Sequence, residues 1–408
     1  TLHPSGALGR LDRASFLAAF DLAGAAPAAD PDTGPASDDL RSRYRELTGH
    51  HVPAARWCLL RVLQAPHAAR LAAGGAARPS PGARAEARRA QARAVQHFLA
   101  GAYLADLSDE PRGPWCVLGL DGVLETEVLG FPAGSPQGML ALRALRAHGH
   151  RVLLATGRSL PEVRDRCDAY RLSGGVGEYG AVCYDAGERT AHVLLPSGRW
   201  EEPDRRLRAR LAALPGVGTD PLARWCVRAR QDGPAGRGPL PHDTVAALLA
   251  DPFVGQRFEA VHGDAQTDFV PRGADPADGL RALLERLGAP GAAPLLAVGG
   301  GPAEVPLLRW ARYGFAARNG GTAVRAAGVP VLRHRYQAGL AEAVAAVVGH
   351  RPGGCPRCRP PRHSPQTRAL LALLAVPEDG RAGAPARLLR LALADLALPR
   401  PGRGAGRR

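Results

Sequence analysis

Short apolar runs alternate with segments of helical periodicity between residues 115 and 349, and this alternation limits the folds open to the chain. The apolar runs have the length of strands, and glycine-rich or polar turns separate them from the helical segments. Strands alternating with helices of this length form a parallel sheet with both faces covered. Strands are predicted at 115–118, 151–155, 175–178, 294–298, 314–317 and 329–332, and helices at 135–145, 161–170, 303–311 and 337–348. We therefore expect an α/β fold with a doubly wound, Rossmann-like parallel sheet.

Two unusual turns follow the first two predicted strands, at 119–124 and at 156–159. In open parallel sheets, ligands bind at the carboxyl ends of the strands. The sequence therefore places a candidate site where these two turns meet.

The turns carry motifs that resemble those of the haloacid dehalogenase (HAD) superfamily, in its sugar-phosphatase-like branch. The first turn reads Gly119-Leu-Asp121-Gly-Val-Leu, against the family's Asp-x-Asp-Gly-(Thr/Val)-Leu, and the second reads Thr156-Gly157-Arg158. The stretch 178–181, Glu-Tyr-Gly-Ala, is similar to the family's Glu/Ser-Asn-Gly-Ala. The resemblance implies a HAD-like domain over 111–349 with an inserted α/β cap at about 182–275, and an ancestral magnesium-dependent phosphatase of small phosphate esters.

The catalytic positions implied by this resemblance are degenerate. Gly119 stands where the family has the aspartate nucleophile, and it has no side chain to attack phosphorus or bind magnesium. Asp121 remains at the position of the general acid and base, and Thr156, Gly157 and Arg158 remain as phosphate-binding groups. The resemblance leaves Asp121 and Glu304 as weak magnesium ligands.

The lysine that normally neutralises the phosphoryl charge is also missing, because the chain contains no lysine. The fourth motif, 299–304, reads Gly-Gly-Gly-Pro-Ala-Glu and keeps one acid, Glu304. An acid, Asp278, stands in the segment where the lysine is expected. Since losing a covalent nucleophile alone costs several orders of magnitude in rate, the sequence favours a pseudoenzyme.

Two alternatives to a catalytically impaired HAD-like protein stay open at this point. One is an active phosphatase in which Asp121 assists attack by water and Arg158 or Arg281 supplies positive charge. The other is a non-enzymatic module that binds a small phosphorylated molecule. In the cap, His262, Asp264 and Asp268 are candidate contacts, although an ordinary polar surface explains them better.

The ends of the chain differ from its centre. Residues 1–110 are expected to form a helical region of unknown role, with helices at 41–48, 54–63 and 83–104. Residues 350–408 form a short basic tail with 12 arginines against 3 acidic residues. Such a tail is a candidate for contact with nucleic acid or an acidic partner, and its segment 385–398 has the pattern of an amphipathic helix.

The tail also holds a group of metal-ligating residue types, namely His350, Cys355, Cys358 and His363. A Cys-x-x-Cys turn presents two thiolates to one ion, and zinc takes four nitrogen or sulfur ligands. A structural zinc site, a redox pair and an incidental exposed cluster are the three interpretations. The remaining cysteines are scattered, and no apolar run or signal-peptide pattern indicates a membrane or an export route, so we expect a cytoplasmic protein without membrane contact.

Overall fold

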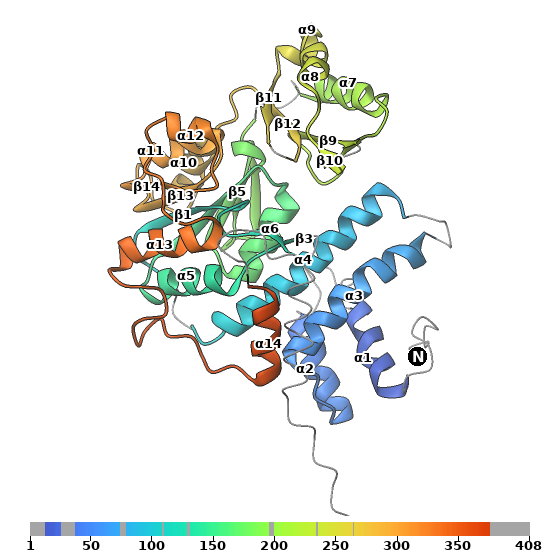
Figure 1. Cartoon of the computed structure of the whole chain (residues 1–408), viewed down its shortest axis with the longest axis vertical. Helices are drawn as coiled ribbons and strands as arrows, with labels where there is room; N and C mark the ends of the chain where they lie inside the picture. The colour runs from blue at the N-terminus through green and yellow to red at the C-terminus, as the bar shows by residue number, and fades with distance from the viewer. Residues whose placement is uncertain are drawn as a thin grey trace, which may run out of the picture.

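The computed structural model describes residues 13–25, 37–73, 79–107, 110–128, 131–195, 200–233, 236–263 and 265–375. The predicted helix at 385–398 lies outside these residues. Two groups of elements flank one large sheet: an inserted cap lies above it and the N-terminal helices lie beside it (Figure 1). Within the described part of the chain, no helix is both long enough and apolar enough to cross a bilayer.

The main sheet has seven strands, of which the first five in spatial order are parallel. The two edge strands after them are antiparallel. In spatial order the strands are β14 (Tyr313–Ala316), β13 (Leu296–Gly299), β1 (Trp115–Gly119), β4 (Arg151–Ala155), β5 (Gly174–Gly177), β6 (Val182–Asp185) and β7 (Thr190–Val193). The central strands are buried on both faces, as their continuous apolar runs require.

Helices cover both faces of this sheet. On one face Cys116 and Leu118 of β1 pack in the same core as α4, α5, α6 and α13, and on the other face Val117 packs with α10 and α11. The covering helices are α5 (Pro136–Ala147), α6 (Leu160–Tyr170), α10 (Pro276–Arg286), α11 (Val305–Trp310), α12 (Thr322–Ala326) and α13 (Tyr336–Val348). Ser135 caps α5 by accepting a hydrogen bond from the Gly138 N–H, as its sequence predicts. The expected doubly wound α/β fold is confirmed.

Some local elements differ from the prediction. The segment 329–332 forms only an isolated bridge, Val331 with Ala316, because it lies beyond the edge strand β14. The helix predicted at 303–311 is divided into a 3-10 turn, η4 (Pro302–Glu304), and α11. A short hairpin of β2 (Thr126–Val128) and β3 (Phe131–Ala133) was not predicted.

The cap has a five-stranded antiparallel sheet and three helices around its own apolar core. The chain leaves the main sheet after β7, later than residue 182. The cap elements are α7 (Glu201–Ala212), β8 (Val217–Thr219), β9 (Val227–Gly233), β10 (Gly236–Gly238), α8 (His242–Leu249), α9 (Pro252–Gly255), β11 (Phe258–His262) and β12 (Thr267–Pro271).

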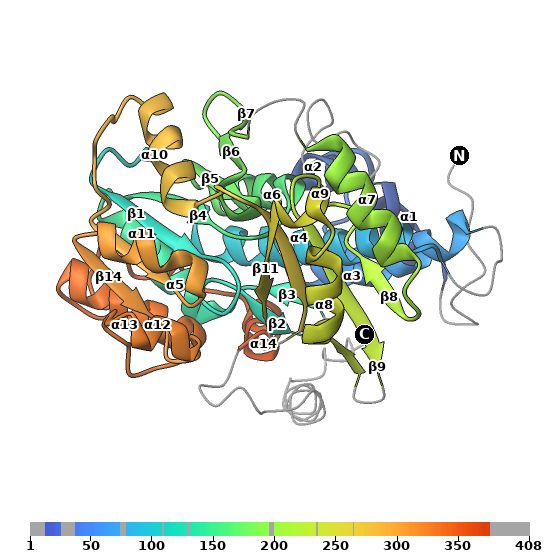
Figure 2. The same ribbon diagram turned by 90° about the horizontal axis from the view of Figure 1, so that it is seen from above.

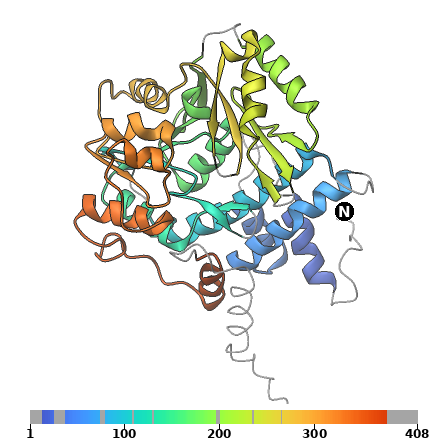
Figure 3. The ribbon, with the colours of Figure 1, turned by 45° about the horizontal axis from the view of Figure 1, so that its top comes forward.

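The N-terminal helices form a layer against the core. They are α1 (Arg13–Ala25), α2 (Ser37–Thr48), α3 (Ala54–Ala72) and α4 (Pro81–Tyr103). In the view from above, α4 crosses the middle of the molecule from these helices toward the main sheet (Figure 2). The last described helix, α14 (Pro365–Leu373), lies beside α3, so the two ends of the described chain pack together (Figure 3).

Candidate functional site

The loops after β1 and β4 meet because the two strands are parallel neighbours with Gly119 opposite Ala155. This register places Asp121, from the first loop, against Arg158, from the second. Arg158 Nη2 donates to Asp121 Oδ1 at 2.7 Å, and its Nε lies 3.1 and 3.0 Å from Oδ1 and Oδ2. Thr156 Oγ1 accepts a hydrogen bond from the Arg158 N–H at 3.1 Å. The structure therefore brings the predicted residues of the two motifs together, and pairs two of them.

Glu304 occupies the space that a side chain at position 119 would need. A Cβ atom built on Gly119 would lie 2.9 Å from Glu304 Oε1 and 3.2 Å from the Val298 carbonyl oxygen. The other oxygen, Oε2, accepts hydrogen bonds from the Gly300 and Gly301 N–H groups at 2.6 and 2.8 Å. Burial raises the pKa of Glu304, Asp121 adds to the increase, and the two N–H donors oppose it. A side chain at position 119 and this glutamate conformation exclude one another.

The residues at this site do not fit a magnesium ion. Magnesium takes oxygen ligands in near-octahedral geometry and usually one or two carboxylates from the protein. Both oxygens of Asp121 are engaged by Arg158, and Glu304 Oε2 is used by two backbone donors. Desolvation raises the pKa of Asp121, but the charge and hydrogen bonds of Arg158 outweigh it and hold that pKa well below its usual value. The cation beside Asp121 is the guanidinium.

Beneath this pair runs a chain of buried ionic contacts that the sequence did not reveal. Arg158 Nη1 contacts Glu162 Oε1 at 3.1 Å, and Glu162 is flanked on its other side by Arg166. Arg166 Nη2 then donates to Glu125 Oε2 at 2.8 Å, and Glu125 is fully buried. Its Oε1 accepts hydrogen bonds from Tyr170 Oη at 2.8 Å and from Gln96 Nε2, on α4, at 3.0 Å. Glu125 follows the first motif directly, and that position was its only signal in the sequence.

The cap contacts the second motif through Arg228, on β9. Its Nη2 donates to the Gly157 carbonyl at 3.0 Å, while Nε donates to Asp268 Oδ1 at 2.8 Å. Both side chains of the Arg228–Asp268 pair are 2 % exposed. Nη1 of Arg228 is buried and has no hydrogen-bond partner within the described part of the chain. Asp268, a candidate from the sequence, is therefore part of the junction between core and cap.

Tyr179 lies against the second motif and explains why residue 157 is a glycine. A Cβ on Gly157 would lie 2.5 Å from the Tyr179 ring, and Tyr179 Oη donates to Asp268 Oδ2 at 2.5 Å. The adjacent Glu178 is fully buried and accepts N–H hydrogen bonds from the cap segment 224–226. Residues 178 and 179 both have positive φ, a backbone region that non-glycine residues rarely adopt. Residues 178 and 179 of the core thus hold the cap by specific contacts.

Other candidates lie away from this junction. His262 is exposed and stacks on His242, with ring centroids 4.4 Å apart, and Asp264 lies outside the described residues. Arg281, on α10, pairs with the exposed Asp278 and covers the Trp310 ring at 4.7 Å. Arg281 is therefore engaged with its own helix and its neighbour, and the charge beside Asp121 comes from Arg158.

The Cys/His group predicted in the tail forms, with one correction. His350, Cys355 and Cys358 come together with His148, at the end of α5, and their four ligand atoms all lie within 4.8 Å of one another. His363 was predicted as the fourth member, and this is wrong. Its ring packs edge-on against Tyr103, with centroids 5.3 Å apart, because the chain turns toward α14 after Cys358. His148 lies 202 residues before His350 in the sequence, and no local motif marks it as a member of the group.

Comparison with known proteins gave structural similarities only. No family model and no curated protein matches the chain. Among solved structures, a haloacid dehalogenase-like hydrolase from Bacteroides thetaiotaomicron has a TM-score of 0.44 at 17% identity, covering 58% of this chain and 100% of that one. The sucrose-phosphatase of Synechocystis has a TM-score of 0.42 at 16% identity, covering 58% and 98%.

A third similar structure is the C-terminal domain of trehalose-6-phosphate phosphatase from C. albicans, with a TM-score of 0.45 at 13% identity, covering 62% of this chain and 97% of that one. At such identities the likeness concerns the fold, and the chemistry of the site has to come from the residues of this chain. In this chain the core is a mainly parallel sheet, and the cap is inserted after β7.

Proposed function

We propose that this chain is a HAD-type protein that has lost the phosphatase mechanism and binds a small phosphorylated molecule between core and cap. One observation carries the first part: the place of the nucleophile is filled by Glu304, whose Oε1 would lie 2.9 Å from a Cβ on Gly119. A residue with no side chain cannot form a covalent intermediate, and the space that such a side chain needs is taken.

Attack by water, with Asp121 as the base, is disfavoured by the same geometry. A general base needs a pKa near the working pH and a free oxygen directed at the water. The pKa of Asp121 lies well below its usual value, and Arg158 engages both of its oxygens. Any such activity would first require this ion pair to open.

The proposal of ligand binding rests on Arg228 and Thr156. Nη1 of Arg228 is a buried donor without a hydrogen-bond partner among the described residues, and an unmade hydrogen bond of this kind costs about 1–3 kcal/mol. A phosphoryl oxygen is the acceptor that a guanidinium pairs with best. Because Nη2 of the same arginine already holds Gly157, a ligand on Nη1 would lie beside the Thr156-Gly157-Arg158 motif.

Two assays test the two parts separately. The native chain should not hydrolyse an aryl phosphate with Mg²⁺, whereas a Gly119→Asp, Gly300→Asp, Glu304→Ala variant, in which the space is cleared, should gain turnover. Measurable turnover by the native chain that Asp121→Asn abolishes would contradict the loss of the mechanism.

Binding is measured by calorimetry with inorganic phosphate and a hexose phosphate. Arg228→Lys keeps a cation beside Asp268 but removes the spare donor, and it should weaken binding by about tenfold, the effect of one charge-assisted hydrogen bond. Arg281→Met, on the surface of α10, is the matched control and should bind as the native chain does. If neither ligand binds the native chain, or if Arg228→Lys binds equally well, the binding proposal is wrong.

A further inference from the structure

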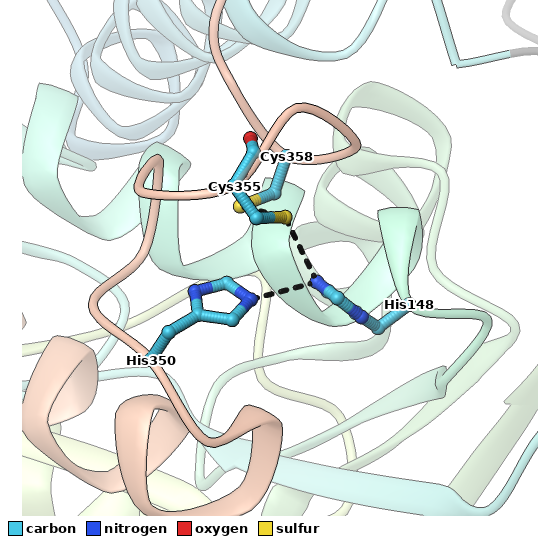
Figure 4. A group of neighbouring side chains, drawn as sticks. All are labelled: His148, His350, Cys355 and Cys358. Atoms are coloured by element: carbon cyan, nitrogen blue, oxygen red, sulfur yellow. Dashed lines mark hydrogen bonds between the residues drawn. The ribbon is translucent and has the colours of Figure 1, made fainter.

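A second cluster of ligating side chains lies far along the chain from the motifs, and it is separate from the function proposed above. His148 ends α5, while His350, Cys355 and Cys358 belong to the loop after α13 (Figure 4). His148 Nε2 lies 3.0 Å from His350 Nε2 and 3.4 Å from Cys355 Sγ, and the two sulfur atoms are 3.3 Å apart. Two imidazole nitrogens and two sulfurs thus converge on one point.

We propose that these four residues bind a structural zinc ion. In a tetrahedral site with Zn–N of about 2.0–2.1 Å and Zn–S of about 2.3 Å, ligand atoms are about 3.3–3.8 Å apart. The three separations given above lie within about 0.5 Å of this range, and no pair exceeds 4.8 Å. Two sulfur and two nitrogen donors select zinc over magnesium or calcium, which take oxygen ligands.

The surroundings orient the ligands as a zinc site requires. His350 Nδ1 lies 2.9 Å from the Arg351 carbonyl, an acceptor that fixes the proton on Nδ1 and leaves the Nε2 lone pair for the metal. This carbonyl-bound imidazole is an outer contact of the kind that orients a metal-binding histidine.

Arg143, on α5, binds the backbone of the loop. Its Nε donates to the carbonyls of Cys358 and Arg359 at 3.1 and 3.0 Å, and its Nη1 and Nη2 pair with Asp106 at 2.6 and 2.8 Å. Cys358 itself is fully buried in the main core. The loop is therefore held against the core by hydrogen bonds and by burial of one of its cysteines.

The position of the site defines its role. His148 lies in the turn between α5 and β4, at the opposite end of the parallel strands from Asp121, so the ion takes no part in chemistry at the motifs. It would join the core to the segment 350–358, and the chain then continues into α14, which packs on α3 of the N-terminal layer. Zinc binding would thereby anchor the C-terminal helix and, through it, the N-terminal helices.

The test uses the full chain as purified, together with variants that distinguish His148 from His363 as the fourth ligand. Metal content is measured after dialysis, and zinc X-ray absorption reports the ligand types. We expect one zinc per chain with two sulfur and two nitrogen ligands. His148→Ala and Cys355→Ser should lower zinc affinity by more than about tenfold, since disturbing even an outer contact costs about that much. His363→Ala is the matched control and should retain the full zinc content.

The outcomes decide between the proposal and its rivals. A native chain that holds no zinc and has Cys355 and Cys358 joined as a disulfide would overturn it in favour of a redox pair. Full zinc retention by His148→Ala, with loss in His363→Ala, would overturn the ligand assignment. If His148→Ala fails to fold, His148→Cys keeps a ligand and should restore both folding and zinc, with three sulfurs in the absorption spectrum; absence of the third sulfur would refute the role of His148.

Discussion

The packing of Glu304 against Gly119 makes a prediction that is specific to this chain. Gly119→Asp should destabilise the protein, because its Cβ would lie 2.9 Å from Glu304 Oε1 and 3.2 Å from a backbone carbonyl that cannot easily move. Overpacking of this kind costs about 1–3 kcal/mol. The new carboxylate would also lie beside Asp121 and Glu304, which adds repulsion between like charges.

Removing the glutamate side chain should relieve most of this cost. Glu304→Ala alone gives up the hydrogen bonds to Gly300 and Gly301, and a loss of about 1–3 kcal/mol is expected. The two changes concern the same space. The loss of unfolding free energy in the double variant should therefore be smaller, by about 1–2 kcal/mol, than the sum of the losses in the two single variants.

The free energies of unfolding of the native chain, both single variants and the double variant are measured by chemical denaturation. Gly119→Ala separates the Cβ contact from the charge, and Gly300→Asp is a control, since a Cβ there meets only Gly320 Cα at 3.7 Å. Strict additivity of Gly119→Asp and Glu304→Ala would refute the argument that Glu304 fills the space that a side chain at position 119 would need.

Three further predictions concern the buried ion pairs. Glu125→Gln removes the buried carboxylate to which Arg166 Nη2 donates and should cost about 3–5 kcal/mol in a denaturation experiment; a change below about 1 kcal/mol would contradict the pairing. Arg228→Met leaves Asp268 as an unpaired buried charge, so proteolysis within the cap should become faster than in the native chain, and unchanged rates would count against a role of this pair in holding the cap. Burial raises the pKa of Glu162, but Arg158 and Arg166 outweigh it and lower that pKa from 4.5 to about 2. The ionised Glu162 contributes on the order of 3 kcal/mol to the free energy of unfolding above pH 5, and this contribution is lost as the pH falls toward 2. In the Glu162→Gln variant the free energy of unfolding should therefore depend less on pH in that window.

The sequence predicted the core well because its strands are buried on both faces. A run such as 115–119 has no other low-energy place than the middle of a parallel sheet, and the motif turns follow from the strand ends. The bridge at Val331 was predicted as a strand because apolar character alone does not show whether a neighbouring strand is available.

The site was only partly predictable, because its partners come from distant segments. Asp121, Thr156 and Arg158 were found from local motifs, whereas Arg228 reaches Gly157 from the cap and His148 joins a loop of the tail. Spacing along the chain favoured His363 as the fourth metal ligand, since it lies as close to the cysteines in sequence as His350 does. Only the packing of α5 against the loop places His148 there instead.

The ion pairs beneath the motifs are best explained by positioning rather than by stability. Replacing a buried ion pair with apolar groups is often neutral or stabilising, so a pair is weak evidence for net stability. Here Glu125 accepts a hydrogen bond from Arg166, and Glu162 accepts one from Arg158 Nη1. The remaining donors of Arg158 are directed at Asp121. Asp121, Glu162 and Glu125 are thus neutralised by arginines of the chain itself. Such a group of acids has no need of a metal to balance its charge, and it is poorly suited to binding one.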